Sequence, residues 1–200
     1  PSRVVANRNR LLQLRARIIH AAAKLMCDRG VAATTISDVA HASGAAVPEV
    51  QHHFPDKTQL VLAVIEREVT VVLDGQDGVE AIVAWNDLDT WVSRVIGDHP
   101  TEDRPLAGPL GALAAELMKS EHYRPALDAA FRTWEGHLSA GLRRIQERGE
   151  LDPVANPDRL AASLIAAMQG GYLLAAVHGR IDIIRDVLDD AIAALRRYRV

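Results

Sequence analysis

The sequence is poor in the residues that build disulfide scaffolds, zinc clusters and membrane spans. Its 200 residues contain one cysteine, Cys27, which excludes an intramolecular disulfide and a multi-cysteine zinc site. Charged residues or glycines interrupt every apolar run before the roughly 18 residues that a membrane helix needs. The opening stretch PSRVVANRNR lacks the apolar core of a signal peptide. These absences predict a cytoplasmic protein with no membrane partner.

The sequence also lacks motifs for catalysis, cofactors and metals. It contains no Gly-x-Ser-x-Gly elbow, phosphate-binding loop or dinucleotide fingerprint. Glu49 lies three residues before His52, but a di-iron bundle needs two such pairs and two further glutamates on long helices. We therefore expect no enzymatic activity, no cofactor and no metal.

The charge of the chain is unevenly distributed. Residues 1–60 hold eight basic and four acidic side chains, whereas residues 61–200 hold 15 and 22. A basic head on an acidic body indicates that only the head meets a polyanion. The alternative is a solvated helix face that is basic without a partner.

Apolar residues recur at spacings of three and four almost throughout, which predicts an all-α fold of about nine helices. We expect a loop at 99–105 and no strand or repeat. The first helix carries its apolar face from Leu11 to Met26 and ends at Gly30. The other predicted helices span 36–42, 46–53, 57–73, 79–96, 106–119, 125–147, 158–178 and 181–197.

Residues 35–53 form a helix-turn-helix candidate. Thr35 and Asp38 have the spacing of a capping box, and Gly44 allows a tight turn between two short helices. The second helix of such a motif places its side chains against base edges in the major groove. The basic first helix and Lys57 lie outside the motif, where they are placed to meet phosphates.

The stretch from Ala16 to Glu66 resembles the DNA-binding head of the TetR family of transcriptional regulators. The resemblance includes Thr35-Ile36, Val39-Ala40, Gly44 and His53-Phe54. The later segment GPLGALAAEL, with Trp85, Trp134 and Gln169-Gly170-Gly171, resembles the LmrA/YxaF-like branch. The resemblance implies a homodimer that reads a pseudo-palindromic DNA operator and responds to a small-molecule effector, most simply as a repressor released by it. It also implies a DNA-binding domain at 1–56 and a ligand-binding and dimerisation domain at 57–200.

Carried onto this chain, the family pattern assigns DNA contacts. Thr34, Thr35, His53 and Lys57 would contact phosphates, and Val47, Pro48, Glu49 and His52 would face base edges. Gln51 stands at a DNA-contacting position where the family usually has tyrosine, and Ala45-Ala46 replaces valine followed by a capping residue. These departures leave a second hypothesis open, a helical ligand-binding dimer that no longer reads DNA.

Aromatic, methionine and polar side chains on the body helices predict a ligand pocket, with ordinary core packing as the alternative. The candidate pocket residues are Trp91, Leu113, Met118, Phe131, Trp134, His137, Met168, Gln169 and Tyr172. The last two helices are candidates for a four-helix dimer bundle, with packing inside one chain as the alternative. The candidate interface residues are Leu160, Leu164, Leu174, Val187, Ile192 and Leu195.

Overall fold

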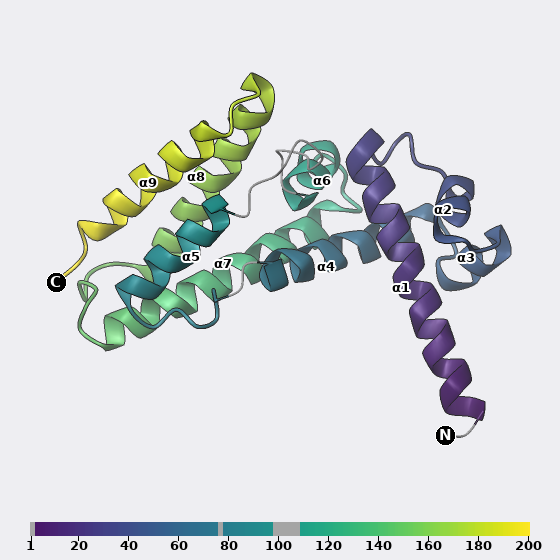
Figure 1. Ribbon diagram of the computed structural model, residues 1–200, viewed down its shortest axis with the longest axis horizontal. Helices are drawn as coiled ribbons and strands as arrows, with labels where there is room; N and C mark the ends of the chain where they lie inside the picture. Colours follow the sequence, from purple (N-terminus) through teal and green to yellow (C-terminus); the bar gives the residue numbers. More distant parts are fainter. Residues whose placement is uncertain (1–2, 76–77, 98–108) are drawn as a thin grey trace. The chain divides into compact units, whose positions relative to one another are not determined.

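A computed structural model describes residues 3–75, 78–97 and 109–200, and over these ranges the chain forms nine α-helices (Figure 1). The helices are α1 (Arg3–Arg29), α2 (Ile36–Ser43), α3 (Val47–His53), α4 (Lys57–Gly75), α5 (Trp85–Gly97), α6 (Pro109–Leu117), α7 (Arg124–Glu147), α8 (Pro157–His178) and α9 (Asp182–Arg196). The described residues contain no strand beyond an isolated antiparallel bridge between Leu151 and Arg199. The predicted all-α fold is confirmed, while the loop predicted at 99–105 lies outside the described residues.

The chain divides into two compact units. The first comprises Pro1–Glu68 and Ala112–Leu127, and the second comprises Val69–Gly111 and Asp128–Val200. Neither unit ends at residue 56, because the start of α4 and most of α6 pack with the first three helices. The functional boundary between 56 and 57 remains a prediction.

The core of the first unit joins α1 to the two short helices that follow it. Ile18 and Ala22 of α1 are fully buried, as are Val39 of α2 and Val50 of α3. Each pair among these three helices is in contact. Burial of these small apolar side chains fixes the crossing of α2 and α3.

Helix α1 is longer than its packed face requires. It begins at Arg3 and runs for 27 residues, but the first buried residue among its described side chains is Ile18. Leu11 and Leu12, at 41% and 57% exposure, lie in the part that precedes the core. The apolar face predicted to start at Leu11 therefore starts about two turns later.

The segment 79–84 is a turn, so the helix predicted at 79–96 begins at Trp85 instead. The Asp87 carboxylate accepts the N–H groups of Val83 and Ala84 at 3.0 and 2.9 Å and caps α5. The Arg144 guanidinium donates to the carbonyls of Glu80 and Ile82 at 2.9 and 2.7 Å. These side chains satisfy backbone groups that a longer helix would have paired.

Helices α8 and α9 lie side by side in the second unit (Figure 1). Leu164, Met168 and Ala175 of α8 are fully buried, and a Cβ on Gly171 would lie 3.5 Å from the Ile184 Cα. Helix α8 is also long and apolar enough to cross a membrane, with a mean hydropathy of 1.7 over its best window. The expectation that no segment reaches this limit is therefore wrong, because residues 160–178 contain no Asp, Glu, Lys or Arg. One such helix is weak evidence for a span.

A glycine of α7 allows close packing against the turn before α5. A Cβ on Gly141 would lie 2.9 Å from the Cβ of the fully buried Ile82. Gly136, on the same helix, is exposed and has no atom within 4 Å of its Cβ position. The two glycines therefore differ in packing and share the same helical backbone.

We expect Gly141→Ala to destabilise the protein by about 1–2 kcal/mol, since overpacking outweighs the gain of about 1 kcal/mol in helix propensity. Gly136→Ala should stabilise it by about 0.5–1 kcal/mol. Urea unfolding followed by circular dichroism measures both changes. A gain in stability for both variants would contradict the close contact at Ile82.

Candidate nucleic-acid interface

Helices α2 and α3 form the predicted helix-turn-helix. Gly44 lies between them in the left-handed region at φ 67° and ψ 26°, a conformation that glycine adopts without steric cost. The N–H of Ala45 then donates to the Ala40 carbonyl at 3.0 Å and closes the turn. The end of α2 and the start of α3 are thus fixed by local backbone geometry.

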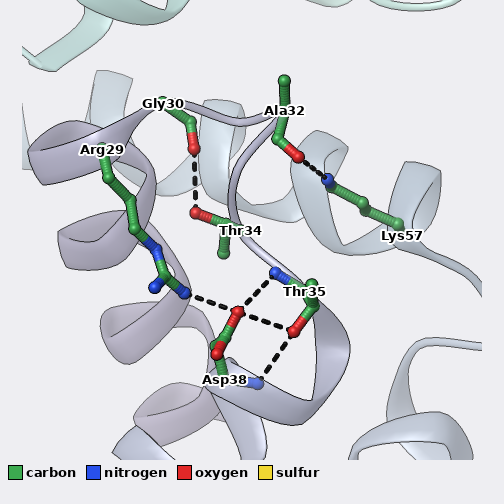
Figure 2. Close-up of polar contacts among 7 residues, drawn as sticks. All are labelled: Arg29, Gly30, Ala32, Thr34, Thr35, Asp38 and Lys57. Atoms are coloured by element: carbon green, nitrogen blue, oxygen red, sulfur yellow. Dashed lines mark hydrogen bonds and ion pairs between the residues drawn. The ribbon is translucent and has the colours of Figure 1, made fainter.

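The start of α2 is held by a capping box (Figure 2). The Thr35 N–H donates to Asp38 Oδ2 at 2.9 Å, and the Asp38 N–H donates to Thr35 Oγ1 at 3.1 Å. Arg29 at the end of α1 lies 2.6 Å from the same carboxylate. The Thr35 hydroxyl, the Thr35 N–H and Arg29 together lower the pKa of Asp38, the hydroxyl most strongly. The capping box predicted from spacing is confirmed, and it joins α1 to α2.

One face of α3 is open to solvent. Val50 is fully buried against α1 and α2, and the residues around it are exposed. The exposed set is Val47, Pro48, Glu49, Gln51 and His52. All four side chains expected to face base edges, and Gln51 with them, are therefore accessible in this structure.

The Glu49 side chain has a structural partner. Its Oε2 accepts the Ala46 N–H at 2.8 Å, which satisfies a backbone donor at the start of α3. Ala46 stands at the N-cap and has no side-chain acceptor of its own. Glu49 thus compensates in part for the missing capping residue, and a base contact by Glu49 would compete with this hydrogen bond.

The two histidines at the end of α3 have different environments. The rings of His52 and His53 meet edge to face with centroids 5.6 Å apart. His52 is exposed and His53 is half-buried. Burial, followed by the neighbouring His52 and Arg15, lowers the pKa of His53. In the free protein, this lowered pKa favours the neutral form of His53.

The structure modifies the expected phosphate contacts of Thr34 and Thr35. Thr34 is buried, at 1% exposure, and its hydroxyl donates to the Gly30 carbonyl at 2.8 Å (Figure 2). A phosphate contact through the Thr34 hydroxyl does not fit this conformation, because the side chain faces the turn after α1. Thr35 is exposed, but its hydroxyl already donates to Asp38 Oδ2 at 2.6 Å.

Lys57 and the arginines of α1 supply positive charge on the first unit. Lys57 Nζ donates to the Ala32 carbonyl at 3.3 Å, which uses one of its three donors (Figure 2). The Arg15 guanidinium lies 5.3 Å from the centroid of the Phe54 ring. Arg8, Arg10 and Arg17 are exposed and have no acidic partner within 4.0 Å among the described residues.

Sequence reasoning missed Glu116 of α6. Its Oε2 accepts the Val31 N–H at 2.7 Å, and its Oε1 accepts the Ala32 N–H at 2.8 Å. The residue is exposed and stands one position before the end of α6, so the local sequence does not mark it as a partner of another segment. No periodicity or local motif connects a residue to a turn 84 positions away.

The predicted pocket residues fall in both units. Leu113 is buried in the first unit, while Met118 of that unit is 54% exposed, and the place of both side chains in a ligand pocket stays a prediction. The exposure follows from its position just beyond the end of α6. The second unit holds Trp91, Trp134 and Met168 as buried side chains and Phe131, His137, Gln169 and Tyr172 as half-buried ones.

Within the second unit, some of these side chains contact each other or a polar partner. The rings of Phe131 and Trp134 stack with centroids 6.2 Å apart, and His137 Nδ1 lies 3.2 Å from Glu80 Oε1. Trp91 Nε1 is buried and has no hydrogen-bond acceptor among the described residues. A buried donor of this kind is uncommon and costly.

Most of the predicted dimer residues are buried inside one chain. Leu160, Leu164, Ile192 and Leu195 have at most 8% exposure, so their side chains are not available to a second chain. They belong to the packing of α8 and α9 with the rest of the unit, which was the alternative interpretation. Val187 is half-buried, and Leu174 is exposed.

The fold is that of a helical regulator with an N-terminal helix-turn-helix. Residues 18–64 match the family described as bacterial regulatory proteins, tetR family. Residues 100–192 match the tetracyclin repressor-like C-terminal domain. The chain therefore belongs to the TetR family of transcriptional regulators, as the resemblance implied.

Two curated relatives and one solved protein extend this comparison. The chain is 28% identical over 159 residues to the HTH-type transcriptional regulator BetI of Rhizobium meliloti (strain 1021), covering 78% of this chain and 74% of BetI. It is 25% identical over 170 residues to the uncharacterized HTH-type transcriptional regulator YxaF of Bacillus subtilis (strain 168), covering 80% and 83%. SmeT, the repressor of the Stenotrophomonas maltophilia efflux pump SmeDEF, matches with a TM-score of 0.68 at 24% identity, covering 93% and 90%. Its triclosan complex matches with a TM-score of 0.69 at 23% identity, covering 91% of each chain.

We expect Thr35→Ala to lower the free energy of unfolding by about 1 kcal/mol, because it removes the N-cap acceptor of α2. Thr35→Ser keeps the hydroxyl and should stay within about 0.5 kcal/mol of the unmodified protein. Denaturant unfolding measures both variants. Equal losses would show that the methyl group, and not the cap, carries the effect.

Proposed function

We propose that this protein is a repressor that binds a pseudo-palindromic operator as a homodimer and is released by a small molecule. The observation that carries the proposal is the exposed face of α3, held at a fixed angle to α2 by Gly44 and the buried Val50. A rigid short helix with free side chains is what major-groove readout requires. Its place of action would be the cytoplasm, where the DNA of a bacterial cell lies.

On this proposal, Val47, Pro48, Gln51 and His52 read base edges. Gln51 carries a side-chain amide, which can pair with adenine N6 and N7 through two hydrogen bonds. Val47 and Pro48 offer apolar contact to a thymine methyl group. A base contact by Glu49 would leave the Ala46 N–H to water. We therefore assign Glu49 the role of holding the start of α3 and not that of reading a base.

On this proposal, phosphate contacts would come from residues outside α2 and α3, on α1 and at the start of α4, and from residues at the ends of the motif. Lys57 keeps two donors after its bond to Ala32, and exposed Arg8, Arg10 and Arg17 lie on α1 of the same unit. His53 would add an imidazole N–H donor, whereas the Thr35 hydroxyl would first have to release Asp38. Such contacts set the register on DNA and make affinity fall with salt.

The second candidate is a ligand-binding dimer that no longer reads DNA. It is favoured by α3 itself, which carries no arginine or lysine and engages its only carboxylate in its own first turn. Selection of duplexes from a random pool by the purified protein separates the two. Enrichment of a pseudo-palindrome supports the repressor, and an unenriched pool supports the second candidate.

With the selected duplex, we expect Gln51→Ala to weaken binding about tenfold at one base position, with an unchanged salt slope. Lys57→Gln should weaken binding to all sequences alike and lower the slope of log K against log salt by about 1. Lys119→Gln, on an exposed lysine of the same unit, is the control. Fluorescence anisotropy at several salt concentrations measures all three variants. An unchanged slope for Lys57→Gln would contradict its phosphate contact.

An apolar face of α8 supports the homodimer. Five exposed residues recur at the spacing of one helix face, namely Ala166, Gly170, Leu173, Leu174 and Val177. Leu173 and Val177 are 59% and 69% exposed. The face has large side chains at one end and small ones at the other, which suits close packing against the same helix of a second copy. Of the residues predicted from sequence, Leu174 lies on this face.

We expect Leu174→Asp to convert the dimer into a monomer at micromolar concentration, because a charge would be buried at the centre of the interface. Val154→Asp is the matched control, since Val154 is 84% exposed in a turn of the same unit. Sedimentation velocity distinguishes the two states. A monomeric unmodified protein, or a dimeric Leu174→Asp variant, would contradict this face as the interface.

The second unit offers the features of an effector site. Stacked Phe131 and Trp134 supply apolar surface, and the unpaired Trp91 N–H would be satisfied by a hydrogen-bond acceptor on a ligand. SmeT, which shares the fold, has been solved with triclosan bound. We propose a mostly apolar effector with at least one acceptor oxygen or nitrogen. Its preference for one of two body states would determine whether the operator is released.

A further inference from the structure

A groove on the first unit lies between α1 and the end of α2. Its volume of about 700 Å³ is within the range of small-molecule sites. Most of its lining comes from α1, between Ala16 and Asp28, and the rest is Ala42 and Ser43 of α2. All of these residues belong to the first unit, so the groove is separate from the aromatic residues assigned to the effector site in the second unit.

Part of the lining offers apolar contact. Ala21 is buried and Leu25 is half-buried on α1, and Ala42 adds only a methyl group. Ser43 is buried, and its hydroxyl already donates to the Ala40 carbonyl at 3.2 Å. A ligand therefore meets small apolar side chains here and no free hydroxyl donor.

The other lining residues form a basic rim. Arg17, His20 and Lys24 follow one another on one face of α1 at spacings of three and four. Arg17 is exposed and has no acidic partner within 4.0 Å in the part of the chain that the structure describes. Asp28 is the one acidic residue of the lining, and its carboxylate pairs with Lys24 at 2.8 Å. The positive charge is thus offset at the Lys24 end of the groove and is free at the Arg17 end.

A contact with α4 orients the His20 ring. Its Nδ1 lies 3.0 Å from a guanidinium nitrogen of Arg67. Since a guanidinium has donors only, Nδ1 is the acceptor in this contact and the ring proton lies on Nε2. Arg67 is paired in turn with Glu68, which is buried at 3% exposure. His20 is therefore held as a hydrogen-bond donor through Nε2, beside the donors of Arg17.

We propose that the α1–α2 groove binds a small amphipathic anion, with its acidic group on Arg17 and His20 and its apolar chain along the lining between the two helices. A carboxylate accepts charge-assisted hydrogen bonds from a guanidinium, and these are among the stronger hydrogen bonds in proteins. The chain of the ligand removes apolar side chains from water. An uncharged ligand would leave Arg17 without a partner, and Arg17 would repel a cation. The inference goes beyond the proposed function, because it concerns a second ligand site and does not require operator binding.

The site can be tested with octanoate as the probe, without DNA. Amide NMR spectra of the full chain should show saturable shifts at Ala21, Leu25, Ala42 and Ser43 on titration with octanoate. We expect 1-octanol, which has the same chain length and no charge, to bind at least about tenfold more weakly at these residues. Octylammonium, which carries the opposite charge, should produce no saturable shifts there.

Two variants separate the basic rim from the apolar lining. Arg17→Gln should raise the dissociation constant of octanoate at least about fivefold and leave that of 1-octanol unchanged. Ala42→Phe places a ring in the lining and should abolish binding of both probes. Lys119→Gln is the control, because it removes an exposed lysine of the same unit that does not line the groove. Should Ala42→Phe fail to fold, Arg17→Gln still tests the site.

Three results would overturn the proposal. Octanoate shifts confined to the second unit would show that the groove is not a ligand site. Equal affinity for octanoate and 1-octanol, or an unchanged octanoate affinity in Arg17→Gln, would show that the basic rim does not select an anion. Co-sedimentation with phosphatidylglycerol vesicles that Arg17→Gln abolishes, without shifts from free octanoate, would assign the rim to a lipid surface instead of a free ligand.

Discussion

The helix-turn-helix depends on the turn that joins α1 to α2. In this turn the Gly30 carbonyl accepts the Thr34 hydroxyl, the Ala32 carbonyl accepts Lys57, and the Val31 and Ala32 N–H groups donate to Glu116. A buried or half-buried backbone group without a partner is costly, so the turn has one favoured arrangement. The start of α2, and through Gly44 the angle of α3, follow from it.

The exposed face of α3 combines two requirements. Val50 must be buried to hold the helix against α1 and α2, while its neighbours must remain free to meet a ligand. The helix lacks a capping side chain at Ala46, and Glu49 makes the other half of a capping box by accepting the Ala46 N–H. The hydrogen bond that stabilises the short helix therefore engages the Glu49 side chain, and Val47, Pro48, Gln51 and His52 remain the exposed candidates for base contacts.

In the second unit, the periodicity of apolar residues does not by itself distinguish a buried helix face from an exposed one. Leucines of α8 and α9 that suit a dimer interface by periodicity are buried within one chain, and the exposed apolar face runs through Ala166, Gly170, Leu173, Leu174 and Val177. Both faces of α8 are apolar, because one packs on α9 and the other is available to a partner. This double use also gives α8 the hydropathy of a membrane span.

The sequence alone determined the features that depend on near neighbours. These are the order of the helices, the capping box of Thr35 and Asp38 three residues apart, and the left-handed Gly44. Tertiary structure decided the rest. It buried Thr34. It moved the start of the helix predicted at 79–96 to Trp85, because Asp87 and Arg144 bind the backbone of the preceding turn. It also placed the Glu116 carboxylate against a turn 84 and 85 residues away. Local hydrogen bonds leave a fixed spacing in the sequence, whereas a contact between remote helices depends on packing and leaves none.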